Sequence, residues 1–374
     1  MRVDRVEAIP LAYTEPNDNN STRHLLLTRV TTDTGHVGWG EAVTMWPEAT
    51  RATAALVEGL APLATGRDPA DSEAIWAALR EHTWWYGNGG IAAFAIAALD
   101  IALWDLAGQQ AGRNVIDLLG GPVHASLPVV ISCHATDGDL GRMTGTMAGW
   151  VRDQQAEGIK IGFGKRGDAR LGFERDRDLR FVQLLRAALP AGSRIMIDIG
   201  AAIHWDVDTA VTRARDWEPY DIAWIEEPLG ADNPAGYRQL KAATTIPIAY
   251  GEREWTPRGV QRITETGTVD IVGVDPGRVE GLTGFRRANG HVLAAGAQIN
   301  AHAWSSAIVT ATSLAASLAA PNCHQIEIKP LPNPMQHELV TSPIHPRNGK
   351  LAALWQPGLG ITIDTAAVER HRTH

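Results

Sequence analysis

Seven residues with acidic, basic or imidazole side chains recur at intervals of 23 to 33 positions, each at or near the end of a short apolar run: Lys165, Asp198, Glu226, Glu252, Asp275, His302 and Glu327. Asp198, Glu226 and Glu252 supply the hard oxygen ligands that Mg²⁺ prefers. One such acid alone is usually a helix N-cap or a surface ion pair. Three on consecutive runs repel one another unless a cation lies between them. We therefore predict one Mg²⁺ per subunit, held by these three carboxylates.

The remaining residues of this set are suited to proton transfer. A carboxylate beside an imidazole fixes its tautomer and raises its basicity, so Asp275 and His302 are predicted to form an acid–base pair. Lys165 is predicted to face this pair from the opposite side as a second base. The alternatives are a purely structural His302 and a solvated loop lysine next to Arg166.

Eight apolar runs separated by helical stretches must position these residues. The runs begin near residues 128, 158, 194, 221, 246, 269, 297 and 324, a spacing typical of alternating strands and helices. Eight such strands predict an α/β fold of the TIM-barrel type, in which the carboxyl ends of the strands meet at one rim. The spacing therefore predicts that the reactive side chains gather at that rim.

A different pattern precedes the barrel. Residues 1–40 alternate like antiparallel strands, and residues 47–120 have helical periodicity. We predict an α+β capping domain over residues 1–122 and a barrel over residues 123–330. The tail, residues 331–374, is rich in Pro and Gly and is predicted to return to the capping domain.

The composition excludes several classes of protein. The chain has 374 residues and a net charge of −8, which is poorly suited to binding nucleic acid or an anionic membrane. Cys133 and Cys323 cannot form a disulfide framework, which favours a cytoplasmic location. The first residues lack the apolar core of a signal peptide. The most apolar run, Ile91–Leu99, stops at Asp100, so a buried helix is expected rather than a membrane span.

Six motifs match the pattern of one enzyme family: TTDTGHVGWGEA, IAALDIALWDLAGQQAG, WIEEP, YGERE, GVDPG and NAHAW. Over nearly its whole length the chain resembles the mandelate racemase/muconate lactonizing enzyme family, the mandelate racemase subgroup of the enolase superfamily. The resemblance implies a (β/α)7β barrel with a capping domain and a homo-oligomer, often an octamer. It also implies a metal site at the three acids, a His302–Asp275 dyad, and Glu327 as an electrophile near the substrate carboxylate.

Two positions depart from the subgroup's pattern. Its usual Lys-x-Lys at the end of the second barrel strand falls here on Phe163 and Lys165, so only the second lysine remains. The alternative register uses Lys160. We favour Lys165 as the base, because Lys160 lies near the start of the strand and has the opposite parity. Gly200 stands where many relatives have a polar residue, and His204 is a candidate to replace it.

Further polar and aromatic side chains are candidates for contacts with a small carboxylate substrate: His24, Trp46, Lys160, His204, Glu227, Arg253, Arg278, Asn300 and Trp304. Of these, Arg253 and Arg278 can bind a carboxylate. Trp46, Trp84 and Trp85 are expected to line the entrance.

A site of this kind removes the proton alpha to a carboxylate and stabilises the enediolate that results. We predict dehydration of a sugar acid to a 2-keto-3-deoxy acid, with Lys165 as base and His302 protonating the departing hydroxyl. A racemase or epimerase of a 2-hydroxy acid is the second hypothesis. A lactone cycloisomerase is third, because such relatives more often carry lysine where this chain has Asp275. A barrel that binds metal or a sugar acid without turnover is the fourth.

Overall fold

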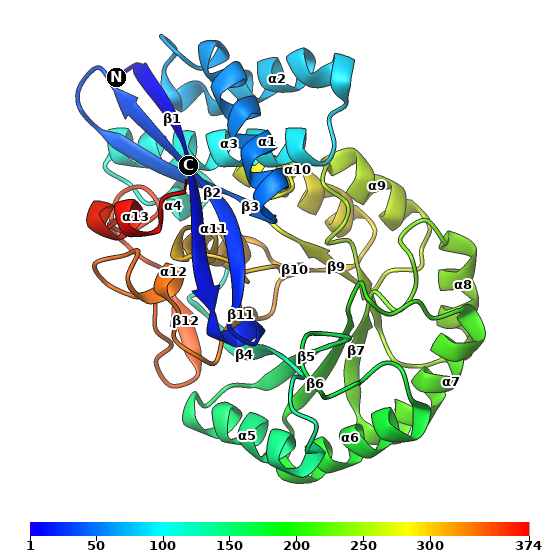
Figure 1. The fold of residues 1–374 in the computed structure, drawn as a ribbon. Coiled ribbons are helices and arrows are strands. Elements are labelled where there is room, and N and C mark those ends of the chain that lie inside the picture. Colours follow the sequence, from blue (N-terminus) through cyan, green and yellow to red (C-terminus); the bar gives the residue numbers. More distant parts are fainter. Residues whose placement is uncertain (374) are drawn as a thin grey trace.

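The computed structural model describes residues 1–373. The N-terminal part begins with an antiparallel sheet of β1 (Val3–Glu15), β2 (Ser21–Thr32) and β3 (Val37–Met45), in the order β1-β2-β3. Four helices follow: α1 (Pro47–Leu60), α2 (Ser72–Thr83), α3 (Ile91–Ala111) and α4 (Val115–Leu118). Figure 1 shows these blue and cyan elements lying together on one side of the barrel.

Eight parallel strands form the barrel: β4 (Ser126–His134), β5 (Gly158–Phe163), β6 (Arg194–Ile199), β7 (Ile222–Glu226), β8 (Ile248–Tyr250), β9 (Ile271–Val274), β10 (Gln298–Ala301) and β11 (Ile326–Ile328). Their hydrogen-bonded order runs from β10 through β9, β8, β7, β6, β5 and β4 to β11. Asn300 on β10 donates to Glu327 Oε1 on β11 at 2.7 Å, which links the two ends of this order. The TIM-type barrel with an N-terminal cap is confirmed.

Helices cover the outside of the barrel (Figure 1): α5 (Leu140–Asp153), α6 (Arg175–Ala188), α7 (Val207–Trp217), α8 (Pro234–Ala243), α9 (Pro257–Glu265), α10 (Gly281–Ala294) and α11 (Ala307–Ala319). Because the strands pack against helices outside and against one another inside, both of their faces are apolar. Val130, Met196, Trp224, Ala249 and Ile271 form a separate buried cluster. The polar residues of the strands therefore stand out at the carboxyl ends.

The C-terminal segment contacts both parts of the chain. It contains α12 (Pro334–His337), β12 (Lys350–Ala352) and α13 (Thr365–His371). β12 pairs antiparallel with β4 of the barrel, and just after α13 the Thr373 N–H donates to the Pro10 carbonyl of β1. In Figure 1 the red helix α13 lies beside the blue N-terminal strands.

Helix α3 continues past the apolar run Ile91–Leu99, so Asp100 lies inside the helix. It has 21 residues and is apolar enough to cross a membrane by length and composition, yet 94% of its most apolar window is buried inside the protein. Asp100 accepts hydrogen bonds from the Thr283 N–H at 2.9 Å and the Thr283 hydroxyl at 2.6 Å, which fixes α3 against α10. The prediction of a buried core helix fits this burial.

Burial raises the pKa of Asp100 from its ordinary 3.8 to about 7. The folded protein thus holds this proton more tightly than the unfolded chain, so the unfolding free energy falls as pH rises from about 4 to about 7. Asp100→Asn removes this titration. Between pH 5 and pH 8 the unfolding free energy of the wild type should fall by about 3 kcal/mol more than that of the variant. Urea denaturation followed by circular dichroism measures this difference. Asp4→Asn at the exposed surface is the control, and an equal difference at both pH values would contradict the prediction.

Candidate active site

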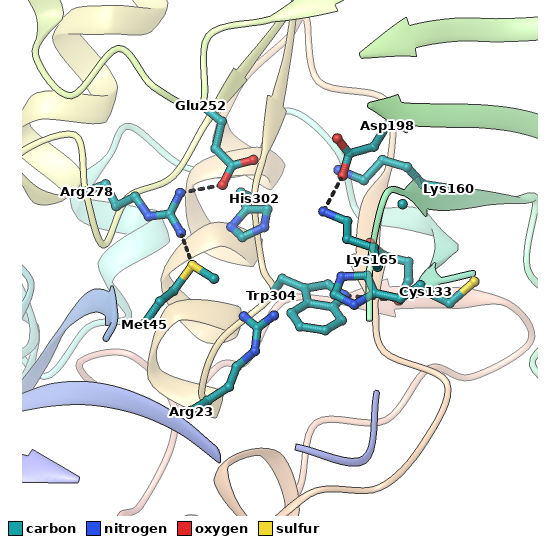
Figure 2. Close-up of a pocket in the computed structure, with 13 residues that line it drawn as sticks. Arg23, Met45, Cys133, Lys160, Lys165, Asp198, Glu252, Arg278, His302 and Trp304 are labelled. Atoms are coloured by element: carbon teal, nitrogen blue, oxygen red, sulfur yellow. Dashed lines mark hydrogen bonds and ion pairs between the residues drawn. The ribbon is translucent and has the colours of Figure 1, made fainter. Parts of the chain in front are cut away.

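A cleft opens at the carboxyl ends of the barrel strands, beneath the cap. It consists of an inner chamber of about 70 Å³ and an outer mouth of about 390 Å³, which share Met45, Lys165, Asp198, Glu252 and Arg278. The inner chamber is also lined by Arg23, Ser132, Cys133, His134, Lys160, Gly162, His302 and Trp304. Figure 2 shows Lys165 and His302 on two sides of this chamber.

Each of the three predicted metal-binding carboxylates is paired with a basic side chain. Lys165 Nζ lies 3.5 Å from Asp198 Oδ2, and Lys160 Nζ lies 3.1 Å from Glu226 Oε2. Arg278 donates to Glu252 Oε1. Asp198 and Glu226 are direct partners across β6 and β7, so the strand register sets two of the acids side by side. Within residues 1–373, no group of three His, Cys, Asp or Glu side chains is arranged so that it could hold a metal ion in these conformations.

The electrostatics of this group reflect burial and crowding. Burial raises the pKa of Glu226 to about 7, with Lys160 opposing the rise and Asp198 adding to it. Burial acts the other way on the Lys160 ammonium, but Glu226 and Glu327 outweigh it and raise the Lys160 pKa well above its usual value. Although burial also disfavours ionised Glu252, His302 and Arg278 lower the pKa of Glu252 well below its usual range. Basic side chains thus offset the crowded negative charge here.

His302 and Asp275, the predicted dyad, form a hydrogen-bonded pair in which Asp275 is buried and His302 is partly exposed to the chamber. His302 Nδ1 lies 2.8 Å from Asp275 Oδ2, and the other oxygen of Asp275 accepts the Gly277 N–H at 2.8 Å. Burial alone would lower the pKa of His302, but the Glu252 and Asp275 carboxylates outweigh it and raise the His302 pKa. Because Asp275 holds Nδ1, Nε2 is the ring nitrogen left for a proton in the chamber.

The structure corrects the reasoning that placed Lys160 away from the rim. Lys160 lies inside the barrel, where its Nζ is 2.8 Å from Glu327 Oε1 in addition to its contact with Glu226. Phe163 instead packs outward, against Phe181 and Trp217 of the helical layer. The inward positions of β5 are therefore 158, 160 and 162, and the Lys-x-Lys positions inferred from the sequence were wrong.

Lys165 reaches the chamber from a loop rather than from the strand. Gly164 has φ +64°, a conformation that favours glycine, and it turns the chain after β5. The Lys165 side chain then folds back over Gly162, where an added Cβ would lie 2.4 Å from Lys165 Cε. The missing side chain at Gly162 therefore makes room for Lys165, and both lysines enter the same chamber.

The buried position of Lys160 predicts a large effect on stability. Lys160→Met leaves Glu226 and Glu327 without their cation, and breaking a buried ion pair on one side costs about 3–5 kcal/mol. Urea denaturation without added metal should show this loss. Lys241→Met is the matched control, because the Lys241–Asp270 pair is about one-third exposed and is expected to contribute less than about 1 kcal/mol. Similar losses in the two variants would contradict the prediction.

Several predicted substrate contacts do line the cleft. Trp304 and Arg278 line the inner chamber, and Trp46, Glu227 and Arg253 line the outer mouth. There Arg253 pairs with Glu227 at 2.8 Å, and Glu227 Oε1 is buried without a hydrogen-bond partner. These five side chains are therefore placed to meet a molecule bound in the cleft.

Other candidates are positioned elsewhere. His24 and His204 line neither the chamber nor the mouth. Asn300 also lines neither of them: it is buried and donates a hydrogen bond to Glu327 Oε1. Trp84 and Trp85 are 66% and 84% exposed and also lie outside the cleft. The expected tryptophan-lined entrance is therefore corrected: the aromatic side chains of the mouth are Trp46, Phe94 and Trp255.

Two basic side chains of the chamber, Arg23 and His134, were not predicted from the sequence. Arg23 is the neighbour of the predicted His24 on β2, and it enters the chamber from the cap. His134 ends β4, the first barrel strand, which is the same kind of position that identified the other polar residues. The strand-end rule would have found His134 if it had been applied to that strand. A capping-domain arginine such as Arg23 has no comparable sequence signal.

Comparison with known proteins identifies the family. Residues 8–120 match the mandelate racemase / muconate lactonizing enzyme N-terminal domain, and residues 142–367 match the enolase C-terminal domain-like family. The chain is 28% identical over 361 residues to the D-galactarolactone cycloisomerase of Agrobacterium fabrum, covering 93% of this chain and 91% of that protein. It is 30% identical over 390 residues to a D-galactonate dehydratase family member of Catenulispora acidiphila, covering 99% and 88%.

A solved structure of a similar protein agrees with this assignment. It is an enolase from Bradyrhizobium in complex with magnesium and mandelic acid, which superposes with a TM-score of 0.87 at 25% identity. The alignment covers 100% of this chain and 99% of that one. With both domain models matched, the chain belongs to the mandelate racemase / muconate lactonizing enzyme family of the enolase superfamily.

Proposed function

We propose that the protein removes the proton alpha to the carboxylate of a sugar acid and eliminates the beta hydroxyl as water. The observation that carries this proposal is the pair Lys165 and His302, which line two sides of one chamber. A substrate held between them presents one face of its alpha carbon to each. Relatives named as D-galactonate and D-xylonate dehydratases support the reaction class.

In the proposed reaction, Lys165 takes the alpha proton and His302 donates a proton from Nε2 to the beta hydroxyl. The alpha C–H and beta C–O bonds break, water leaves, and the resulting enol becomes a 2-keto-3-deoxy acid. Asp275 keeps the His302 ring oriented by holding Nδ1. Lys160, which lines the chamber and lies 2.8 Å from Glu327 Oε1, is proposed to contact the reacting carboxylate, and Glu327 is proposed to act as the electrophile predicted from the sequence.

The proposed metal ligands are Asp198, Glu226 and Glu252. Three carboxylates at neighbouring strand ends are a donor set that suits Mg²⁺, and the buried, unpartnered Glu227 Oε1 beside them is a further sign of unbalanced negative charge. A bound Mg²⁺ supplies Lewis-acid stabilisation of the enediolate. A cation held by these carboxylates would replace the contacts of Lys165 with Asp198 and of Arg278 with Glu252, and would leave Lys165 available as the proposed base. The Bradyrhizobium enolase solved with magnesium supports this choice of metal.

Two other reactions share the first step. Racemisation or epimerisation of a 2-hydroxy acid is favoured by the same opposed pair, because inversion needs a proton donor on the second face. Cycloisomerisation is favoured by the similarity to the A. fabrum D-galactarolactone cycloisomerase. Dehydration is preferred because relatives of this chain are named D-xylonate and D-galactonate dehydratases.

The proposal is tested with purified protein, Mg²⁺ and a panel of five- and six-carbon sugar acids and their lactones in D₂O. Formation of a 2-keto acid with loss of one hydroxyl is the expected result. Deuterium at the alpha carbon with inversion and no keto acid would instead establish an epimerase, and lactone opening a cycloisomerase. Absence of exchange, elimination and ring opening across the panel overturns the proposal.

A further inference from the structure

The cap-facing end of the chamber holds a preorganised hydrogen-bonding group on Arg23. Its Nε and Nη2 donate to Asp18 Oδ2 at 3.1 and 3.0 Å, and Ser21 Oγ donates to the same oxygen at 2.7 Å. The Arg23 side chain is 12% exposed and lines the chamber. Because Asp18 engages one edge of the guanidinium, Nη1 is the nitrogen whose N–H groups remain for a bound molecule.

His134 stands next to Arg23 and is held by the same carboxylate. Its Nδ1 lies 3.0 Å from Asp18 Oδ1, and its Cδ2 faces the space above Gly162 that Lys165 also fills. Burial lowers the pKa of His134 to about 4, although the hydrogen bond to Asp18 opposes this. A neutral ring that donates a hydrogen bond from Nδ1–H to Asp18 has an unprotonated Nε2, which can only accept a hydrogen bond.

Trp304 fixes both groups in place. The His134 ring stacks on Trp304 with centroids 4.4 Å apart, and the Arg23 guanidinium lies 4.5 Å from the Trp304 centroid. The Trp304 indole N–H donates to the Ser132 carbonyl at 3.1 Å, which anchors this platform to β4. Figure 2 shows Arg23 and Trp304 on the side of the chamber away from Asp198 and Glu252.

We propose that Arg23 and His134 form a specificity site for a hydroxyl group on the substrate chain beyond the reacting carbons. This inference rests on the proposed function, which places the carboxylate end near Asp198 and Glu252. A hydroxyl can accept from Arg23 Nη1 and donate to His134 Nε2 at once, whereas a methylene or an aromatic ring satisfies neither. The site therefore selects hydroxylated acids over acids with an apolar group at that position.

The test compares binding of long and short acids by isothermal titration calorimetry with Mg²⁺ present. The long probes are the five- and six-carbon sugar acids, and the short probe is glycolate, whose chain ends at the alpha carbon. Arg23→Met and His134→Phe should raise the Kd of the sugar acids by about 10- to 100-fold, the range expected for loss of a hydrogen bond to a charged or buried group. The Kd of glycolate should not change.

Arg29→Met is the matched control. Arg29 lies on the same strand as Arg23, pairs with Glu7 and stacks near Trp39 (centroid distance 5.9 Å), but it lies outside the cleft. It should alter neither Kd. Unchanged sugar-acid binding in both test variants, or an equal loss for glycolate and sugar acids, overturns the inference. A wild type that binds glycolate but no sugar acid also overturns it and leaves alpha-proton removal intact. A wild type that binds no acid refutes the proposed function itself.

Discussion

Replacing Lys165 with methionine is expected to lower kcat by about 10²- to 10⁴-fold, the contribution usual for a positioned acid or base. The reason is geometric: Lys165 is the amine that faces Asp198 and the chamber, opposite His302. His302→Asn should lower turnover by a similar factor. The two variants should differ in exchange, because His302→Asn retains the proposed base and should still exchange the alpha proton with solvent deuterium.

Gly162→Ala offers a second test of the same assignment that keeps the lysine. An alanine Cβ would collide with Lys165 Cε and crowd His134 Cδ2, at 2.4 and 3.1 Å. The amine should therefore be displaced, and kcat should fall although Lys165 is still present. Lys241→Met, at the barrel exterior, is the control and should keep full activity. Full exchange by Lys165→Met would exclude this residue as the base and point to Lys160.

Removing the metal is expected to abolish turnover. Lewis-acid stabilisation is worth several kcal/mol, and each 1.36 kcal/mol is a factor of ten in rate, so EDTA should reduce the rate by about 10⁴-fold or more. Added Mg²⁺ should restore it. Asp198→Asn and Glu252→Gln should prevent this recovery and should weaken Mg²⁺ binding in titration calorimetry.

Asp216→Asn is the matched control for these ligand variants, because Asp216 pairs with Arg175 on the barrel exterior. It should bind Mg²⁺ like the wild type. Activity that survives complete removal of divalent metal, or Mg²⁺ affinity that is unchanged in both ligand variants, would show that the three carboxylates do not form the metal site.

The barrel could be predicted from the sequence because each strand is a short apolar run that ends in a polar residue. Every predicted strand lies within two residues of its observed start, from Ser126 in the first to Ile326 in the eighth. The same regularity indicated which residues would meet: Asp198 and Glu226 are neighbours in register, and His302 contacts Asp275. The sequence thus predicts how far along a parallel strand each polar residue lies.

The sequence predicts less well to which face of a strand a side chain points. β5 is buried on both faces, so its sequence shows no alternation from which to read the inward positions, and Lys160 was assigned to the wrong face. A lysine within the apolar run GIKIGF was itself a sign of a buried partner. Arg23 and His24 pose the same problem on β2, where the pairing with β3 is irregular between His24 and Leu26. Only the folded sheet shows which of the two enters the cleft.

The contact of the tail with the first strand has a consequence for how the protein is made. Pro10 of β1 and Thr373 are joined through the backbone although 363 positions separate them in the chain. β4 likewise forms an antiparallel pair with β12, which lies more than 200 residues later in the sequence. Contacts between segments that are distant in the sequence form slowly. Until they form, the unpaired strand edges can pair with incorrect segments or with other chains. During synthesis, β1 of the cap and β4 of the barrel must therefore lack these partners until residues 350–373 have been translated.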